Sequence, residues 1–236
     1  MQKNSVKVFV LAFATLMVVS CATSLTQAQT QKNSYPAMAP VSEYMMPQSA
    51  EIALARTAAP KSISDGAAVM VLGHDGYTTA VKGTNGFLCI VERGWGAATD
   101  EVEFWNSKIR APICFNPAAA RTFAPIYLMK TKLVLAGKSK TEILQATDLA
   151  FDKKELPDLE RGSMCYMTSK EQYLNDIGKS WHPHLMVLIP GDAAESWGAN
   201  LPSSPVIAAN DPQEHVTLFM VELSKWSDGT AAPPTD

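Results

Sequence analysis

The alternation of apolar and polar positions predicts strands at both ends of the chain's body and helices between them. In the first part, apolar runs are separated by Asp75-Gly76 and Asn85-Gly86. These dipeptides are typical of tight hairpin turns, because both central residues of such a turn need positive φ. We therefore expect an N-terminal three-stranded meander. Its strands, together with one further extended segment, cover residues 67–72, 78–81, 87–91 and 110–115.

Two helices are predicted in the middle of the chain. Asn116-Pro117 supplies a favoured N-cap and first helical residue, and the pattern continues to Ala136 with a break or kink at Pro125. The run Ser139-Lys140-Thr141-Glu142 has the spacing of a capping box, which predicts the start of a second helix. The apolar face of this second helix ends at Leu156.

The second half of the chain returns to extended patterns. The unbroken apolar run Leu185 to Ile189, closed by Pro190-Gly191, fits a strand that is covered on both faces. Further strands are predicted over residues 163–168 and 215–223, with short helices near 168–171 and 192–198. Strands grouped on either side of helices indicate an α+β fold with a mostly antiparallel sheet and helices packed on it.

The start of the chain has the pattern of an export signal. Lys3 and Lys7 precede an uncharged apolar run, Val8 to Val19, which is shorter than the roughly 20 residues of a membrane span. Small residues allow cleavage after Ala28, and Cys21 also stands where a bacterial lipoprotein carries its lipid. We expect an exported protein, periplasmic or extracellular, with a lipid anchor at Cys21 as the alternative.

The predicted domain organisation follows from these segments. Residues 1–28 form the signal peptide, residues 29–46 a flexible linker, and residues 47–228 a single globular domain that opens with a short helix. The last residues, 229–236, are predicted to be disordered. No membrane span is expected once the signal is removed.

The charge balance argues against nucleic acid as a partner. The net charge of −3 becomes −5 when the two lysines of the signal peptide are removed, and no basic run is present. A mildly acidic surface has no electrostatic attraction for a phosphate backbone. A small molecule or a component of the cell envelope fits better.

Three histidines form a candidate metal site. His182 and His184 alternate along one strand, so their side chains should point to the same side. If the strand that begins at His215 pairs with it, three imidazoles could hold zinc, or copper. The alternative is that these are strand-end histidines hydrogen-bonded to loops.

A second candidate site lies at the end of the third predicted strand. Glu92 and Arg93 stand beside Trp95 there, and His74 in the first turn could join them to line a polar ligand-binding pocket. The alternative is an ordinary salt bridge at the rim of the domain.

The cysteines suggest one disulfide. After cleavage at Ala28 the chain keeps Cys89, Cys114 and Cys165, and Cys89 to Cys114 would close a moderate loop. Cys165 would then be a free thiol, either a nucleophile paired with His182 or His184 or an inert buried side chain.

Three segments resemble an uncharacterised family of exported bacterial proteins. They are Asn116-Pro117-Ala118-Ala119-Ala120-Arg121, Trp181-His182-Pro183-His184-Leu185-Met186 and Trp197-Gly198-Ala199-Asn200-Leu201-Pro202. The resemblance would cover most of residues 47–228 and implies export and a single shared domain. It implies no activity, cofactor or catalytic residue.

Two functions are therefore expected in order, ahead of a third, a lipid-anchored structural protein of the envelope. The first is a non-catalytic exported module that binds a small ligand or an envelope component, since the chain contains five tryptophans and no complete catalytic set. The second is a metal-dependent enzyme, or a metal-binding protein, that uses the three histidines with zinc or copper.

Overall fold

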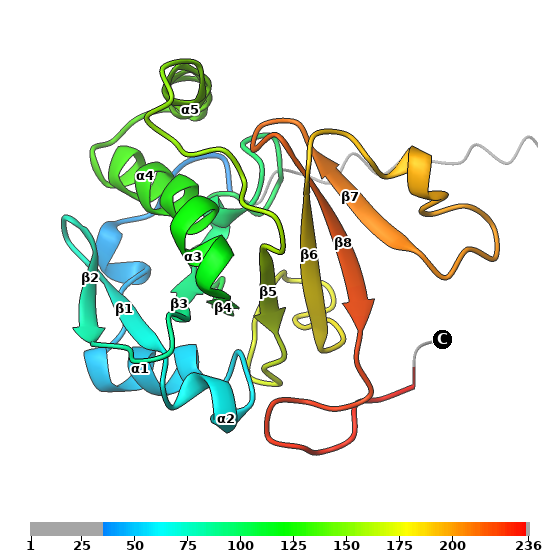
Figure 1. The fold of residues 1–236 in the computed structure, drawn as a ribbon. Coiled ribbons are helices and arrows are strands. Elements are labelled where there is room, and N and C mark those ends of the chain that lie inside the picture. The colour runs from blue at the N-terminus through cyan, green and yellow to red at the C-terminus, as the bar shows by residue number, and fades with distance from the viewer. Residues whose placement is uncertain (1–34, 235–236) are drawn as a thin grey trace, which may run out of the picture. The chain divides into compact units, whose positions relative to one another are not determined.

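The computed structural model describes residues 35–234. The predicted signal peptide, Cys21 included, lies outside these residues. The described part of the chain forms a mixed sheet of eight strands together with five α-helices (Figure 1). The strands are β1 Ala68–Gly73, β2 Gly76–Val81, β3 Leu88–Glu92, β4 Ala111–Phe115, β5 Met164–Met167, β6 His184–Pro190, β7 Ile207–Asp211 and β8 Val216–Glu222.

The sheet is mostly antiparallel, which confirms the predicted α+β class. Its strand order is β2-β1-β3-β4-β5-β6-β8-β7, and β1 with β3 makes the one parallel pair. Antiparallel neighbours need only short connections, and a parallel neighbour needs the chain to cross over. The first three strands show where this crossing occurs.

The predicted meander is wrong in its third strand, which pairs with β1 and not with β2. The segment between β2 and β3 crosses the start of β1, where the amide of Thr84 donates to the Gly66 carbonyl at 2.7 Å. Gly83 makes this crossing possible, since a Cβ there would lie 2.3 Å from the nitrogen of Ala68. The Asn-Gly signal therefore marks a crossing loop and not a hairpin.

Replacing Gly83 with alanine is expected to destabilise the protein by about 1–3 kcal/mol, the usual cost of forcing extra atoms into a packed site. The backbone must shift, because the atom that the new methyl would meet belongs to the main chain. Urea denaturation measures the loss. Gly178→Ala is the control, because a Cβ there would have its nearest neighbour at 3.6 Å. Equal stabilities of the two variants would contradict the role given to Gly83.

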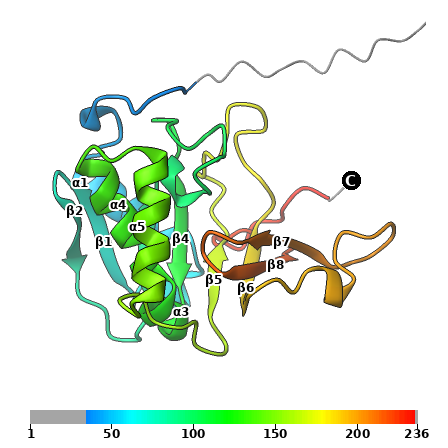
Figure 2. The same cartoon turned by 90° about the horizontal axis from the view of Figure 1, so that it is seen from above.

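The helices cover the two faces of the first half of the sheet (Figures 1 and 2). Helix α1 (Gln48–Arg56) packs on β1, β3 and β4, and the short α2 (Lys61–Ser64) follows it. On the other face lie α3 (Pro117–Thr122) and α4 (Ala124–Leu135), and α5 (Lys140–Asp152) packs on α4.

The predicted helix signals are confirmed. The side chain of Asn116 caps α3, and Phe123 separates α3 from α4 just before Pro125. Ser139 and Glu142 form the predicted capping box of α5. The strands β6, β8 and β7 extend away from these helices (Figure 2).

Strand β3 explains how the two faces are kept apart. Cys89 and Val91 point into the core under α1, whereas Ile90 belongs to the larger core under α4. Side chains alternate across a strand, so Glu92, which follows the same parity as Ile90, belongs to the α4 face. Its neighbour Arg93 belongs to the opposite face.

Three boundary predictions need correction. Tyr44, in the predicted linker, is fully buried and its hydroxyl donates to the Trp105 carbonyl at 2.8 Å, so the fold begins before residue 47. In the predicted disordered tail, Thr230 accepts a backbone hydrogen bond from Trp226 at 2.9 Å. The predicted helix at 168–171 does not form, because the Thr168 hydroxyl donates to the Ala58 carbonyl at 2.8 Å.

Candidate functional site

A cavity of about 260 Å³ lies where the helical half of the sheet meets the half without helices. Its walls are α4 and the segment between β3 and β4, and its floor is the α4 face of β4, β5, β6 and β8. The floor and walls are apolar because every second residue of these strands points this way. The apolar lining includes Ala111, Ile113, Phe123, Tyr127, Met167, Met186 and Leu218.

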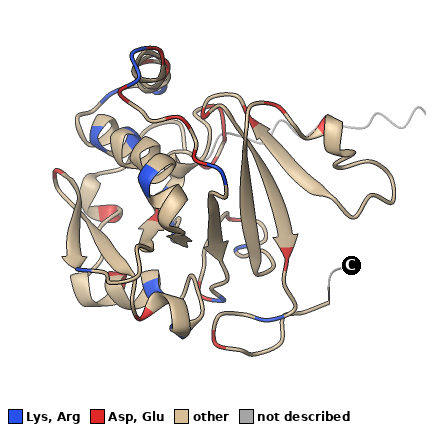
Figure 3. Ribbon diagram, viewed as in Figure 1, with Lys and Arg blue, Asp and Glu red and all other residues tan. Residues whose placement is uncertain are grey.

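Four carboxyl groups supply the charged lining of this cavity. They are Glu92, Glu103, Asp211 and Glu214; Arg93 also lines the cavity, but its guanidinium lies against Glu51 on the opposite face of the sheet. Lysine, arginine, aspartate and glutamate are interspersed over the described part of the chain as a whole (Figure 3). The one-sided lining of the cavity therefore differs from the rest of the fold.

Glu214 is held by a lysine of α4. Its side chain is 8% exposed, and its Oε1 lies 2.9 Å from the Nζ of Lys130. Lys130 also donates to the Ala97 carbonyl at 2.9 Å, which fixes the ammonium against the segment that follows β3. Burial raises the pKa of Glu214, and Lys130 opposes that rise. The positive charge of Lys130 therefore neutralises the negative charge of Glu214.

Glu92 has no such partner. It is half-buried at the end of β3, and its carboxyl makes no hydrogen bond or ion pair with the described residues. Burial and then the charge of Glu214 raise the pKa of Glu92 from 4.5 to about 8, although Lys130 acts in the opposite direction. At neutral pH the carboxyl is therefore mostly protonated and can donate a hydrogen bond into the cavity.

Gly96 leaves the room that the Glu92 carboxyl occupies. A Cβ at residue 96 would lie 3.1 Å from Glu92 Oε2 and 3.2 Å from the ring of Tyr127. The tight turn Gly94–Gly96 is thus part of how the carboxyl is placed. Chemically, the site combines an apolar chamber, a carboxyl that changes charge near neutral pH, and a second carboxylate already paired with an ammonium.

The structure does not bring the residues of the predicted ligand-binding pocket together. These residues are Glu92, Arg93, Trp95 and His74. Glu92 and Arg93 both line the cavity, but the guanidinium of Arg93 is directed to Glu51 on the opposite face, as the alternation requires. Trp95 is fully buried and donates to the Thr131 hydroxyl at 2.9 Å. His74 is exposed in the turn between β1 and β2, apart from the other three.

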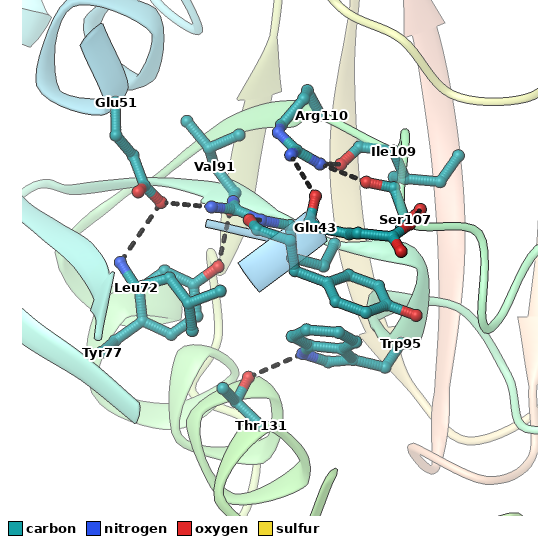
Figure 4. Close-up of polar contacts among 12 residues, drawn as sticks. Glu43, Glu51, Leu72, Tyr77, Val91, Trp95, Ser107, Ile109, Arg110 and Thr131 are labelled. Carbon is teal, nitrogen blue, oxygen red and sulfur yellow. Dashed lines mark hydrogen bonds and ion pairs between the residues drawn. The ribbon is translucent and has the colours of Figure 1, made fainter. Parts of the chain in front are cut away.

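Arg93 instead forms a buried structural ion pair. Its Nη2 lies 2.8 Å from Glu51 Oε1, and both side chains are 0% exposed. Its Nε donates to the Tyr44 carbonyl at 2.8 Å, and Nη1 donates to the carbonyl of Val91. Figure 4 shows Glu51 bonded in addition to the amide of Leu72. This network fastens α1 to the central strands.

The three predicted metal ligands are not brought together. His184 pairs with Glu222 at one end of the β6–β8 ladder, and His215 precedes Val216 at the other end. Six residues of strand separate the two ends, a distance on the order of 20 Å. Within residues 35–234 no group of three histidine, cysteine, aspartate or glutamate side chains is placed to hold a metal ion.

Each of the predicted histidines has another role or position. His184 is 3% exposed, packs on Trp181 with ring centroids 4.5 Å apart, and has its Nδ1 2.7 Å from the His182 carbonyl. Burial lowers the pKa of His184, which favours the neutral ring. His215 stacks on Phe151 with centroids 4.4 Å apart. The alternative of a strand-end histidine hydrogen-bonded to a loop thus describes His184, whereas His215 makes a ring contact.

The cysteine predictions are confirmed in the pairing. Cys89 and Cys114 form a disulfide between directly opposed residues of β3 and β4. Cys165 is a free, fully buried thiol. Burial, followed by the nearby charges of Glu92 and Glu214, raises its pKa well above the usual value, which opposes formation of the nucleophilic thiolate.

Sequence reasoning missed Glu214 and Lys130. They are 84 residues apart in the chain, and a single acid in a turn or a single lysine on a helix is an ordinary surface pattern.

Among the described residues no helix is both long and apolar enough to cross a membrane. Comparison with protein-family models, curated proteins and solved structures finds no match.

Proposed function

We propose that this protein is an exported bacterial module that binds a small, mainly apolar ligand in the cavity beside Glu92, without catalysing a reaction on it. The observation that carries the proposal is an apolar chamber with one unpaired carboxyl group. Small-molecule sites are typically apolar clefts with a few polar groups that fix orientation. The volume, about 260 Å³, suits a ligand smaller than a typical drug molecule.

The lining supports binding more than catalysis. Among the described residues it holds no serine, threonine, cysteine or histidine side chain, so the commonest nucleophiles and the imidazole base are missing from the wall. The hydroxyl of Tyr127 is held by the backbone amide of Arg93 at 2.6 Å, and no nucleophile of the described lining stands beside the Glu92 carboxyl for it to activate. Export is proposed on the N-terminal pattern and on the family resemblance. A buried disulfide is compatible with an oxidising compartment.

Filling the cavity tests the proposal. Leu218→Trp should occupy the floor of the cavity and abolish the binding of 1-hexanol and benzyl alcohol, measured by saturation-transfer NMR. Val221→Trp is the matched control, because Val221 lies on the same strand, points to the opposite face and is already 46% exposed. The control should bind like the wild type.

Two results would count against the proposal. One is that neither probe binds the wild-type protein at millimolar concentration. The other is that both tryptophan variants keep the same binding, since the ligand would then occupy a place other than the cavity.

A further inference from the structure

We infer that the ligand of this cavity is an organic amine, with an apolar body on the floor of the chamber and a protonated nitrogen bound between the carboxyls of Glu92 and Glu214. The inference rests on the proposed function and adds the chemical class of the ligand. It follows from the charges that the cavity presents and from the hydrogen-bond capacity that they leave open.

The described residues around the cavity offer unused hydrogen-bond acceptors but no unpaired cation. The Glu92 carboxyl accepts no hydrogen bond from the described residues. Glu214 uses Oε1 for Lys130, and its Oε2 makes no hydrogen bond with the described residues. Of the described cations near these carboxyls, Lys130 is already shared between Glu214 and the Ala97 carbonyl, and Arg93 is paired with Glu51. An anionic head group would be repelled by the Glu214 carboxylate and would oppose ionisation of Glu92, whereas an ammonium donates to the open carboxyl oxygens and offsets the charge of Glu92 once that group ionises.

The two outer carboxylates are engaged in local structure. Asp211 accepts from the backbone amides of Gln213 and Glu214, at 2.9 and 3.1 Å. Glu103 bonds to the side chain of Asn106 and to the amide of Asp176. Both add negative potential at the edge of the cavity, which favours a cation, but the direct partners remain Glu92 and Glu214.

Binding of an amine must displace a proton from Glu92. Glu214 of the β7–β8 turn and Lys130 of α4 act on this carboxyl, and Glu92 in turn raises the pKa values of Tyr127 of α4, Cys165 of β5 and Tyr77 of β2. Below pH 8 the free carboxyl is mostly protonated, and the ammonium form of the ligand stabilises the carboxylate. The protonated amine therefore binds as a cation, one proton passes from Glu92 to solvent, and no covalent bond changes.

The test compares three six-carbon probes of different charge: hexylamine, 1-hexanol and hexanoate. Isothermal titration at pH 6, 7, 8 and 9 should show hexylamine binding at least about tenfold more tightly than 1-hexanol at pH 8, and no binding of hexanoate. Affinity for hexylamine should rise about tenfold per pH unit up to pH 8 and then level off, because one proton is released below that pH. Titration at pH 6.5 in two buffers with different ionisation enthalpies should count close to one proton.

Glu92→Gln should remove both the pH slope and the preference for the amine. Glu171→Gln, which changes an exposed glutamate outside the cavity, should keep both. If 1-hexanol binds in a manner sensitive to Leu218→Trp but hexylamine binds no tighter, the amine inference is overturned and the proposed function stands. If no probe binds, both are overturned. An amine preference that survives Glu92→Gln also overturns the inference.

Discussion

Replacing Arg93 with methionine is expected to lower the free energy of unfolding by about 3–5 kcal/mol, the usual cost of removing one partner of a buried ion pair. Glu51 would be left as a carboxylate that is 0% exposed, and its Oε2 already accepts no hydrogen bond. The carbonyls of Tyr44 and Val91 would lose their donors as well. Urea denaturation followed by tryptophan fluorescence measures the loss.

Two further variants show whether the unpaired charge of Glu51 causes the loss of stability. The double variant Glu51→Leu with Arg93→Met should recover much of the stability, because a buried pair replaced by apolar groups is often close to neutral. Arg121→Met removes one partner of an exposed pair with Glu160, whose side chains are 60% and 45% exposed, and should cost less than about 1 kcal/mol. Equal losses in Arg93→Met and Arg121→Met would show that burial does not govern the effect.

Glu92→Gln is expected to stabilise the protein increasingly as the pH rises from 5 to 8. The pKa of Glu92 is about 8 in the folded chain, against an ordinary value of 4.5, so the folded state binds the proton more tightly than the unfolded state. In the wild type, the contribution of Glu92 to stability is therefore greatest below its unfolded pKa and is lost as the pH rises through its folded pKa. Glutamine stays neutral and avoids this loss.

The gain at pH 8 and above should be on the order of 3 kcal/mol, since each pKa unit corresponds to about 1.4 kcal/mol and a partly exposed group realises only part of its shift. Urea denaturation at pH 5, 6, 7 and 8 gives the two stability curves. Glu171→Gln should follow the wild type at every pH, because Glu171 is exposed. Parallel curves for the wild type and Glu92→Gln would mean that the carboxyl is ionised throughout this range.

Local signals predicted most of the secondary structure. The cap at Asn116, the break before Pro125 and the capping box from Ser139 to Glu142 all appear where the pattern places them. These features depend on hydrogen bonds and steric contacts within about four residues, and such contacts are legible in one sequence. The Cys89–Cys114 disulfide was a plausible choice among the three pairings that the cysteines beyond the predicted signal peptide allow.

Strand pairing was harder to predict from the sequence than secondary structure. A turn dipeptide such as Asn85-Gly86 indicates a change of direction, but it does not say on which side of β1 the next strand lies. The side is decided by the close passage of Gly83 over Ala68 and by the pairing of β3 with β4. Likewise, the pattern around His215 predicts a strand, while the antiparallel register with β6 places that residue far from His184.

The candidate site shows the same division between what the chain alone determined and what folding decided. By itself the sequence determined that an acid ends the apolar strand β3, and strand alternation could already have separated Glu92 from Arg93. Only the tertiary structure brought Glu214 and Lys130 to that acid across 84 residues. The physical reason is that burial and charge, which set the chemistry of a carboxyl, depend on neighbours in space and not on neighbours in the chain.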